Sequence, residues 1–161
     1  MKRPITALLL SCALLTGCAF GPFAPDVPPG SPETALYSLY GKPLAVYPTV
    51  NGKIIEWETP DTAQNAYMAQ VDAAGRVIWH GDVRTMERFA IIVPGQSTKA
   101  DVLRTIGHPS EAEFLALSRQ EVWTYRFREE MIWHSMMHFY FDANGVVTRM
   151  EKGLDDIYLR D

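Results

Sequence analysis

Arg84 to Phe114 read RTMERFAIIVPGQSTKADVLRTIGHPSEAEF, and this stretch carries the clearest helix signals in the chain. The side-chain oxygen of Thr98 can cap a helix, and Asp101 follows three residues later, as in a capping box. Gly107 can adopt the left-handed conformation that ends a helix, and Pro109 prevents the helix from resuming. Between these signals lies an apolar stripe at helical spacing: Val102, Leu103 and Ile106. The stretch therefore predicts a helix that begins after Thr98 and ends at Gly107.

The residues after this helix alternate as in antiparallel strands. EVWTYRF ends at Phe127 and HFYFDANGVV ends at Val147, with Ala143-Asn144-Gly145 as a tight-turn sequence. Ser118-Arg119-Gln120 is typical of an earlier hairpin turn. One strand face would carry Trp123, Tyr125, Phe127, Met137, Phe139 and Phe141, and the other Thr124, Arg126 and Arg128. Because a sheet this short must bury one face, we expect the helix to lie across the aromatic side.

The first part of the chain repeats the landmarks of this pattern in the same order. The pairs are Pro29-Gly30 with Pro94-Gly95, Gly41-Lys42-Pro43 with Gly107-His108-Pro109, Trp57 with Trp123, and Asp72-Ala73-Ala74-Gly75 with Asp142-Ala143-Asn144-Gly145. The separation is 66 residues at the tryptophan and 70 at the aspartate. We expect the additional residues in a hairpin loop between those two landmarks, where a longer loop costs little. The pattern predicts an internal duplication with two copies.

The first copy follows the same plan. Ser31 is predicted to cap a helix whose first residue is Pro32, where the missing N–H costs nothing. That helix would carry an apolar stripe and end at Gly41. The stripe and the strand residues after it are Leu36, Leu39 and Tyr40, then Ile55 and Trp57, then Tyr67, Ala69 and Val71, then Val77 and Trp79.

The fold class that follows is α+β, with two tandem pseudo-repeats. Each repeat would be a helix packed on a small antiparallel β-sheet. The predicted boundaries are residues 31–83 for the first repeat, 84–152 for the second and 153–161 for a C-terminal tail.

The N-terminus is typical of an export signal. Lys2 and Arg3 precede an apolar run from Ile5 to Leu15, which is too short to span a bilayer. LTGC, ending at Cys18, directly follows and resembles a lipobox, in which the cysteine is acylated and becomes the first mature residue. We therefore expect residues 1–17 to be a lipoprotein signal peptide and Cys18 to be the lipidation site. An ordinary signal with a chance cysteine is the alternative.

Residues 18–30 contain four prolines and predict an extended, semi-rigid membrane tether. Lys2 and Arg3 leave with the signal, so 13 of the 15 basic residues remain against 19 acidic ones, a net charge of −6. A negative protein gains nothing from phosphate backbones, so we expect no nucleic-acid partner. Because the second cysteine, Cys12, leaves with the signal, no thiol remains for a disulfide.

The quoted stretch, together with EVWTYRF and HFYFDANGVV, resembles the SmpA/OmlA (BamE-type) outer-membrane lipoproteins. Their pattern is a glycine before a helix that carries a valine, then Gly-x-Pro, a Trp-x-Tyr strand and an Asp-x-x-Gly turn. The second copy matches through most of its length. It departs from the family where Gln96 replaces the usual methionine and where seven places, not six, separate Gly95 from Val102. The duplicated arrangement also resembles the β-lactamase-inhibitor protein, so fold alone does not fix function.

No motif predicts catalysis, a metal or a cofactor. His134 and His138 are spaced as in HxxxH, but in a strand four residues span about 13 Å, too far for two imidazoles to share one ion. His80 and His108 show no partner pattern. Ser135, His138 and Asp142 form a triad only as a list of types. The adjacent acids Glu129-Glu130 and Asp155-Asp156 are expected in a solvated turn and a tail.

We therefore expect a non-catalytic lipoprotein, anchored by lipid in the outer membrane and facing the periplasm. The resemblance implies an envelope protein as its partner, such as the β-barrel assembly machine. No motif in the sequence indicates a small-molecule substrate. We expect binding around Gly95–Pro109 and the sheet face that bears Arg126 and Arg128. The alternative is a periplasmic enzyme inhibitor or envelope-stress binding module, as the resemblance to the β-lactamase-inhibitor protein implies.

Overall fold

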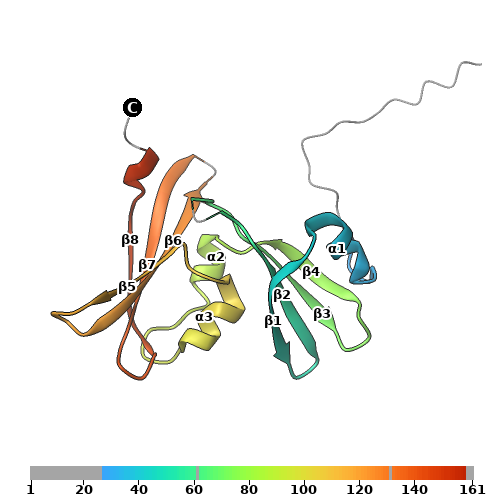
Figure 1. The fold of residues 1–161 in the computed structure, drawn as a ribbon, viewed down its shortest axis with the longest axis horizontal. Helices are drawn as coiled ribbons and strands as arrows, with labels where there is room; N and C mark the ends of the chain where they lie inside the picture. Colours follow the sequence, from blue (N-terminus) through green and yellow to red (C-terminus); the bar gives the residue numbers. More distant parts are fainter. Residues whose placement is uncertain (1–26, 61, 131, 159–161) are drawn as a thin grey trace, which may run out of the picture.

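A computed structural model describes residues 27–60, 62–130 and 132–158 of the protein. They form two four-stranded antiparallel sheets and a few short helices, which confirms the α+β class (Figure 1). The first sheet contains β1 (Pro43–Thr49), β2 (Gly52–Trp57), β3 (Tyr67–Asp72) and β4 (Val77–Asp82). The second contains β5 (Glu111–Leu115), β6 (Gln120–Glu129), β7 (Trp133–Phe141) and β8 (Val147–Leu154). The helices are α1 (Thr34–Tyr40), α2 (Met86–Phe89), α3 (Lys99–Ile106) and the 3-10 turn η1 (Asp156–Tyr158).

Both sheets are meanders, in which each strand pairs with the next one in sequence. The two turns that end in Gly75 and Gly145 are built alike. In each, one aspartate oxygen accepts two backbone N–H groups, Asp72 Oδ1 from Ala74 and Arg76 and Asp142 Oδ1 from Asn144 and Val146. These Asx-type bonds explain why both turns were recognisable from sequence.

Helix α3 begins and ends as its sequence predicts. Thr98 and Asp101 form both bonds of the capping box, and Gly107 follows the helix with φ +77°. Helix α1 likewise ends before Gly41, at φ +77°, but its start differs from the prediction. Its N-cap is Glu33, whose side chain forms no capping hydrogen bond, so the expected cap at Ser31 and Pro32 is wrong. Pro32 instead lies in a β-bridge with Arg76.

The second sheet buries its aromatic face against α2 and α3. Phe89 lies edge-on to Phe127, with ring centroids 5.0 Å apart, and Tyr125 lies edge-on to Phe139 at 5.4 Å. This face was predicted from the alternation of β6 and β7. The buried cluster comprises Phe89, Ile92, Val102, Ile106, Trp123, Tyr125, Phe127, Met137, Phe139, Phe141 and Val147.

The first sheet is covered on both faces. Leu36 of α1 is fully buried in a cluster that contains Val27, Ile55, Trp57, Ala69, Val71 and Val77. Side chains on the opposite face form a second cluster of Ala66, Met68 and Val83, against which Tyr47, Ile54 and Trp79 pack. The Arg88 guanidinium of α2 lies 4.0 Å from the Trp79 ring centroid on this side. The layers are therefore α1, the first sheet, α2 with α3, and the second sheet (Figure 1).

The elements that were not predicted include β1 and α2. Strand β1 alternates only weakly and contains Pro43 and Pro48, which suits its position at the edge of the sheet. Helix α2 has a single turn, capped by the Thr85 hydroxyl, which accepts the Arg88 N–H at 3.4 Å. The sequence predicted one helix before the second sheet, and the structure has two, α2 and α3.

The register corrects the predicted equivalence of Trp57 and Trp123. Ile55 lies opposite Ala69, three residues before Asp72, and Trp123 lies opposite Phe139, three residues before Asp142. In the second sheet the position of Ile55 is thus taken by Trp123, and that of Trp57 by Tyr125. The additional residues are divided between the two hairpins on either side of the tryptophan, and do not all follow it.

Candidate functional site

A buried carboxylate joins the two halves of the molecule. Glu56 of β2 has only 3% of its side chain exposed, and it accepts the backbone N–H of His108 at 2.7 Å and the Tyr47 hydroxyl at 2.6 Å. His108 Nδ1 lies 2.9 Å from the same carboxylate and donates to it when that nitrogen carries the proton. Burial and the bond to Glu56 raise the pKa of Tyr47 well above its usual range. The cluster fixes the end of α3 to the first sheet.

Arg84 is the second link between the halves. Its side chain is almost fully buried and donates to the Ala63 carbonyl at 2.5 Å, the Ser110 hydroxyl at 3.0 Å and the His108 carbonyl at 3.3 Å. Its guanidinium also lies 6.0 Å from the Tyr125 ring centroid. The residues between β2 and β3 are thereby tied to the loop that precedes β5.

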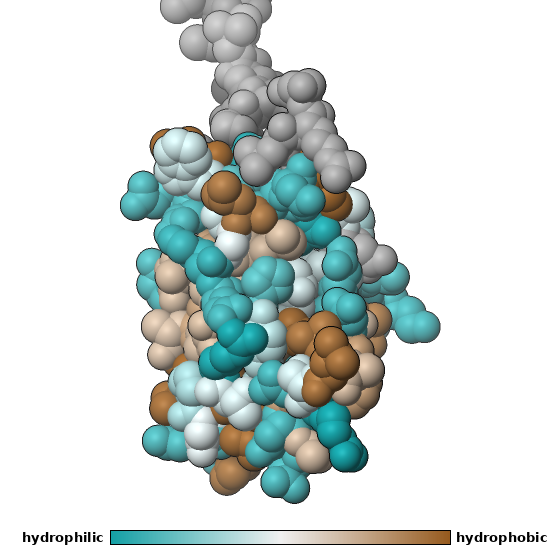
Figure 2. All heavy atoms as spheres, turned by 90° about the vertical axis from the view of Figure 1, so that its left-hand side faces the viewer, coloured by the Kyte–Doolittle hydropathy of each residue, from teal (hydrophilic) through white to brown (hydrophobic). Residues whose placement is uncertain are grey.

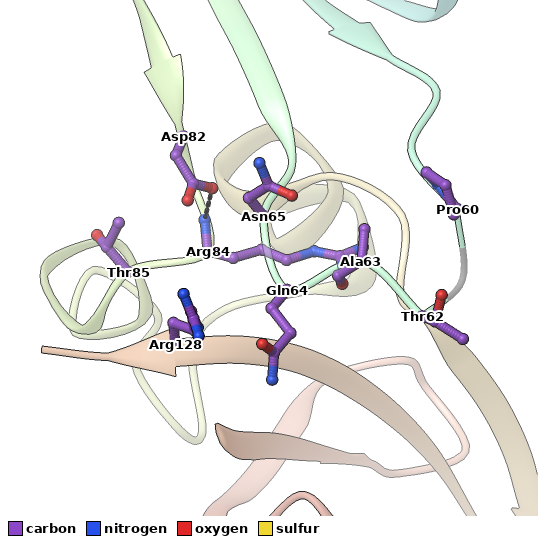
Figure 3. A pocket seen from close by; sticks show the side chains of 9 residues that line it. All are labelled: Pro60, Thr62, Ala63, Gln64, Asn65, Asp82, Arg84, Thr85 and Arg128. Carbon is purple, nitrogen blue, oxygen red and sulfur yellow. Dashed lines mark hydrogen bonds between the residues drawn. The ribbon is translucent and has the colours of Figure 1, made fainter. Parts of the chain in front are cut away.

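A cavity of about 550 Å³ opens beside Arg84, between the two sheets (Figure 3). We call it the central cavity. Its described lining comes from the segment before β3, from the end of β4 and the residues that lead into α2, and from β6. These residues are Pro60, Thr62, Ala63, Gln64, Asn65, Asp82, Arg84, Thr85 and Arg128. A volume of this size lies within the range of about 300–1,000 Å³ that is usual for ligand pockets.

The outer face of the second sheet forms a second, shallower hollow of about 290 Å³, which we call the open face. It is lined by Glu111, Glu113, Leu115, Val122, Thr124, Arg126, Met136, His138, Tyr140 and Asp156. Helices α2 and α3 do not cover it, because they pack on the aromatic side, and Asp156 of η1 contributes to its lining. Figure 2 shows this side of the molecule, where hydrophilic side chains run down the middle and more apolar ones lie to either side.

A row of polar residues crosses the open face from edge to edge. Glu111, Thr124, His138 and Glu151 are direct neighbours on β5, β6, β7 and β8. The Thr124 hydroxyl lies 2.9 Å from His138 Nδ1. Burial lowers the pKa of His138 below its usual value, although Glu151 and Glu111 oppose the shift.

The sequence predicted that Arg126 would be available for binding on this face, and that prediction is wrong. Only 5% of its side chain is exposed, because the guanidinium forms ion pairs with Asp155 and with Glu111, the latter at 2.8 Å. Asp155 is fully buried, so its expected place in a solvated tail is also wrong. Arg128, by contrast, is exposed and lies at the central cavity. In the segment Gly95–Pro109, which was predicted to bind, Val102 and Ile106 of α3 are buried, whereas Gly95 and Gln96 in the loop before α3 are exposed.

The described histidines do not form a shared site. His134 and His138 lie on β7, as the strand interpretation predicted, opposite Arg128 and Thr124. His134 Nδ1 lies 2.9 Å from Gln64 Oε1, a contact between the halves. His80 contacts the Tyr40 hydroxyl through Nδ1 at 3.1 Å and accepts the Val27 N–H through Nε2 at 3.3 Å. Within residues 27–60, 62–130 and 132–158, no three potential ligands are grouped for a metal.

The structure does not bring Ser135, His138 and Asp142 together as a triad. Ser135 is buried on the aromatic side of β7, His138 lies on the open face and Asp142 lies in the turn after the strand. Glu129 pairs with Lys152 at 2.6 Å, while Glu130 is exposed in the turn at φ +50°.

Sequence reasoning missed Glu56, Arg84 and the contacts of His80 and His108. All of these depend on partners more than 20 residues away or in the other half of the molecule, which no local pattern reveals. The sequence contained one signal for Glu56. This acidic residue interrupts the apolar run Ile54, Ile55, Trp57, which forms a strand of the sheet that is covered on both faces.

The predicted signal peptide, Cys18 and most of the tether lie outside the described residues. In the part of the protein that the structure describes, no helix has the length and apolar character needed to cross a membrane. No protein family model, curated protein or solved structure matches the sequence.

Proposed function

We propose that the protein is a non-catalytic outer-membrane lipoprotein that binds another envelope protein and assists outer-membrane protein assembly or envelope integrity. The lipobox at Cys18 supports the anchor, and the resemblance to SmpA/OmlA lipoproteins supports the assembly role. The observation that carries the binding role is the open face, a four-stranded sheet surface on which neither α2 nor α3 packs. A sheet face without a packed α-helix, with apolar side chains among charged ones, is suited to contact with a protein.

The proposal includes a tandem of two BamE-like units. Matching backbone bonds support the duplication: Val77 and Val147 each accept from a glycine N–H, of Gly30 and Gly95, both at 2.7 Å. Each of these valines also donates at 2.9 Å to a serine shortly after that glycine, Ser31 or Ser97. Isolated bridges of Pro32 with Arg76 and of Thr98 with Val146 complete the correspondence. Each helix start is thus tied to the last hairpin of its own sheet.

The second candidate function is an enzyme inhibitor or envelope-stress binding module. The central cavity favours it, because an inserted side chain of an enzyme would meet residues from both halves there. The two functions require different partners and are therefore separable in cells.

Crosslinking in intact envelopes, followed by recovery of the full lipidated protein, tests the assembly role. Subunits of the β-barrel assembly machine should be recovered with it. Tyr140→Ala and Arg149→Glu on the open face should lower that recovery at least fivefold. Val50→Asp, at the exposed β1–β2 turn, is the matched control and should leave recovery unchanged.

Deletion of the gene separates the two candidates. The assembly role predicts increased permeability to large antibiotics or a lower level of folded barrel proteins. Normal permeability with an intact barrel inventory, together with nanomolar inhibition of a periplasmic enzyme by the purified protein, would decide for the inhibitor.

A further inference from the structure

We propose that one end of the second sheet enters the lipid surface to which the protein is anchored, with an exposed tryptophan at the interface. Four exposed apolar residues form this surface, which we call the apolar tip: Ile132, Trp133, Leu154 and Ile157. The inference rests on the lipid anchor of the proposed function, and it adds an orientation of the folded part on the membrane.

The apolar tip continues the aromatic face of β7 beyond the helices that cover it. Ser135 and Met137 are buried on that face, and Trp133 is the next residue on the same side of the strand. Phe89 of α2 packs against Phe127, which lies opposite Ser135. Trp133 lies one row farther along the sheet, and there 60% of the residue is exposed.

The other members of the tip lie at the same end of the sheet. Ile132 directly precedes Trp133, and Leu154 lies opposite Ser135 on the edge strand β8, diagonal to Trp133. Ile157 follows three residues later, in η1. The exposed fractions of these three apolar residues are 65%, 64% and 49%. Large apolar side chains grouped in this way on a surface mark a site of contact.

The start of the described chain lies toward the same end of the molecule. The Val27 N–H is bonded to His80 of β4, and the neighbouring strand β3 is preceded by Gln64. Gln64 Oε1 lies 2.9 Å from Nδ1 of His134, the residue after Trp133. Figure 1 shows the beginning of the described chain, beside α1, and the β6–β7 hairpin in the upper half of the molecule.

The lipid anchor therefore brings the apolar tip close to a bilayer. Nine residue steps of the predicted tether lead from Cys18 to Val27, roughly 30 Å when extended. Because the tether keeps the local concentration of lipid high, a contact that is weak by itself is sufficient. Tryptophan is enriched at membrane interfaces, since its ring is apolar and its N–H remains near water and headgroups.

The charges near the tip favour a lipid headgroup without net charge. Glu129, opposite Trp133, is paired with Lys152 at 2.6 Å. Glu130 and Asp156 are exposed, and their carboxylates repel an anionic headgroup. The expected ligand is thus a zwitterionic phospholipid surface, which is held by apolar contact and not by charge.

The test uses the full lipidated protein in vesicles of phosphatidylethanolamine and phosphatidylcholine with brominated acyl groups, which quench a tryptophan that enters the bilayer. Trp133 is the exposed reporter, because Trp57 and Trp123 are buried and the Arg88 guanidinium lies over the ring of Trp79. The brominated lipid should quench the fluorescence, and Trp133→Phe should reduce the quenching at least threefold.

Leu154→Ser removes part of the tip without changing a tryptophan, and it should lower the quenching at least twofold. Leu117→Ser is the matched control, since Leu117 is a large exposed residue beyond the opposite end of β6, and it should leave the quenching unchanged. Quenching of Trp133 by iodide in the water, but not by brominated lipid, would overturn the proposal. Protection from both quenchers, together with a crosslinked dimer, would overturn it in favour of contact between two copies.

Mass spectrometry and flotation of the same sample separate the tip from the anchor. A lipidated protein that floats with the vesicles while Trp133 stays unquenched would overturn the tip and leave the anchor intact. A protein without lipid on Cys18 would contradict the anchor. In that case, quenching of Trp133 that Leu154→Ser weakens would still support the tip, and its absence would overturn it.

Discussion

Trp57 and Tyr125 perform the same task in the two halves of the molecule, although they differ in residue type. Trp57 Nε1 donates to the carbonyl of Gly41 at 3.1 Å, and the Tyr125 hydroxyl donates to the carbonyl of Gly107 at 3.0 Å. Each side chain thereby satisfies the glycine that ends a helix, a position where carbonyls otherwise lack a partner. The aromatic ring beneath each helix also carries the polar group that caps it.

Removal of the polar group alone should therefore destabilise either half. Tyr125→Phe leaves the carbonyl of the buried Gly107 without its donor, which costs about 1–3 kcal/mol. Trp57→Phe removes the donor to the carbonyl of Gly41, which is exposed to water, so the lost bond itself should cost less. The control is Tyr140→Phe, whose hydroxyl donates to Glu151 near the surface at 2.8 Å and should matter by less than about 0.5 kcal/mol. Urea unfolding of the three variants measures the differences. Equal losses at all three positions would show that the glycine carbonyls do not depend on these donors.

Gly107 and Gly41 should differ in their tolerance of a methyl group. Both have φ +77°, a conformation that costs an L-residue about 1–3 kcal/mol. A Cβ on Gly41 meets nothing within 4 Å, whereas one on Gly107 would lie 2.5 Å from Glu56 Oε1. Gly107→Ala should thus cost at least about 1–3 kcal/mol more than Gly41→Ala, as an overpacked site does.

The additional loss at Gly107 should disappear when Glu56 is shortened. In a double-mutant cycle with Glu56→Ala, the two substitutions should couple by more than about 0.5 kcal/mol. Additive effects would mean that the carboxylate moves aside without cost, and that the joint between the halves is looser than the two hydrogen bonds between Glu56 and His108 indicate.

The segment after β8 should contribute strongly to stability. Asp155→Ala leaves the buried Arg126 guanidinium without one of its two acidic partners, and breaking such a pair typically costs about 3–5 kcal/mol. Asp156→Ala, at the exposed neighbouring position, should change the free energy of unfolding by less than about 0.5 kcal/mol. Thermal or urea unfolding measures both. Similar small effects at the two positions would mean that Asp155 is solvated, as its sequence suggests, and not buried against Arg126.

His138 should make stability depend on pH in mildly acidic solution. Burial lowers its pKa in the folded state, so between that value and the unfolded value of about 6.5 the unfolded protein binds more protons. Its contribution to stability is therefore complete above about pH 6.5 and is lost as the pH falls to the folded pKa. Asp101 and Glu121, whose pKa values are also lowered, by hydrogen bonds with Thr98 and Lys99, respond only below the usual carboxylate range.

The measurement is urea unfolding from pH 7.5 to pH 5. His138→Gln should flatten the fall in stability across this interval. An unchanged slope in His138→Gln would mean that the imidazole is not desolvated on the open face.

Local signals in the sequence were sufficient for most of the fold. The capping box of Thr98 and Asp101, the glycines that end α1 and α3, and the aspartate turns all depend on contacts within a few residues. Such contacts are encoded where they occur, so a single sequence reveals them. The aromatic alternation of β6 and β7 predicted the core in the same way.

The errors arose where distant contacts decide the outcome. Trp57 and Trp123 are the same residue type, but hairpin length sets the register, and the added residues are divided between two hairpins. Arg126 alternates outward, but Asp155 lies over it from the segment after β8. The candidate site was hidden for the same reason, since the central cavity combines Gln64 and Arg128 from opposite halves.

The last prediction concerns the anchor. Val27, the first described residue, is buried in the first half and donates its N–H to His80, so the backbone is held from that point onward. Nine residue steps lead from Cys18 to Val27, and at about 3.1 Å per step they give an extended tether of roughly 30 Å. A lipid on Cys18 should therefore keep the folded part close to the membrane surface.

Cys18→Ala should yield a protein without lipid mass that is released in soluble form when cells are lysed, whereas the unchanged protein should sediment with membranes. One acyl group gives only marginal membrane binding, so stable attachment needs several of them on Cys18. Cys18→Ala removes all of them, and membrane binding should therefore be lost completely. Ala19 lacks the charge of the aspartate that retains many lipoproteins at the inner membrane, so the unchanged protein should have outer-membrane density in a sucrose gradient. Ala19→Asp should move it to inner-membrane density without releasing it. Membrane association of Cys18→Ala, with no lipid mass on the unchanged protein, would contradict the anchor; inner-membrane density of the unchanged protein would contradict only its sorting.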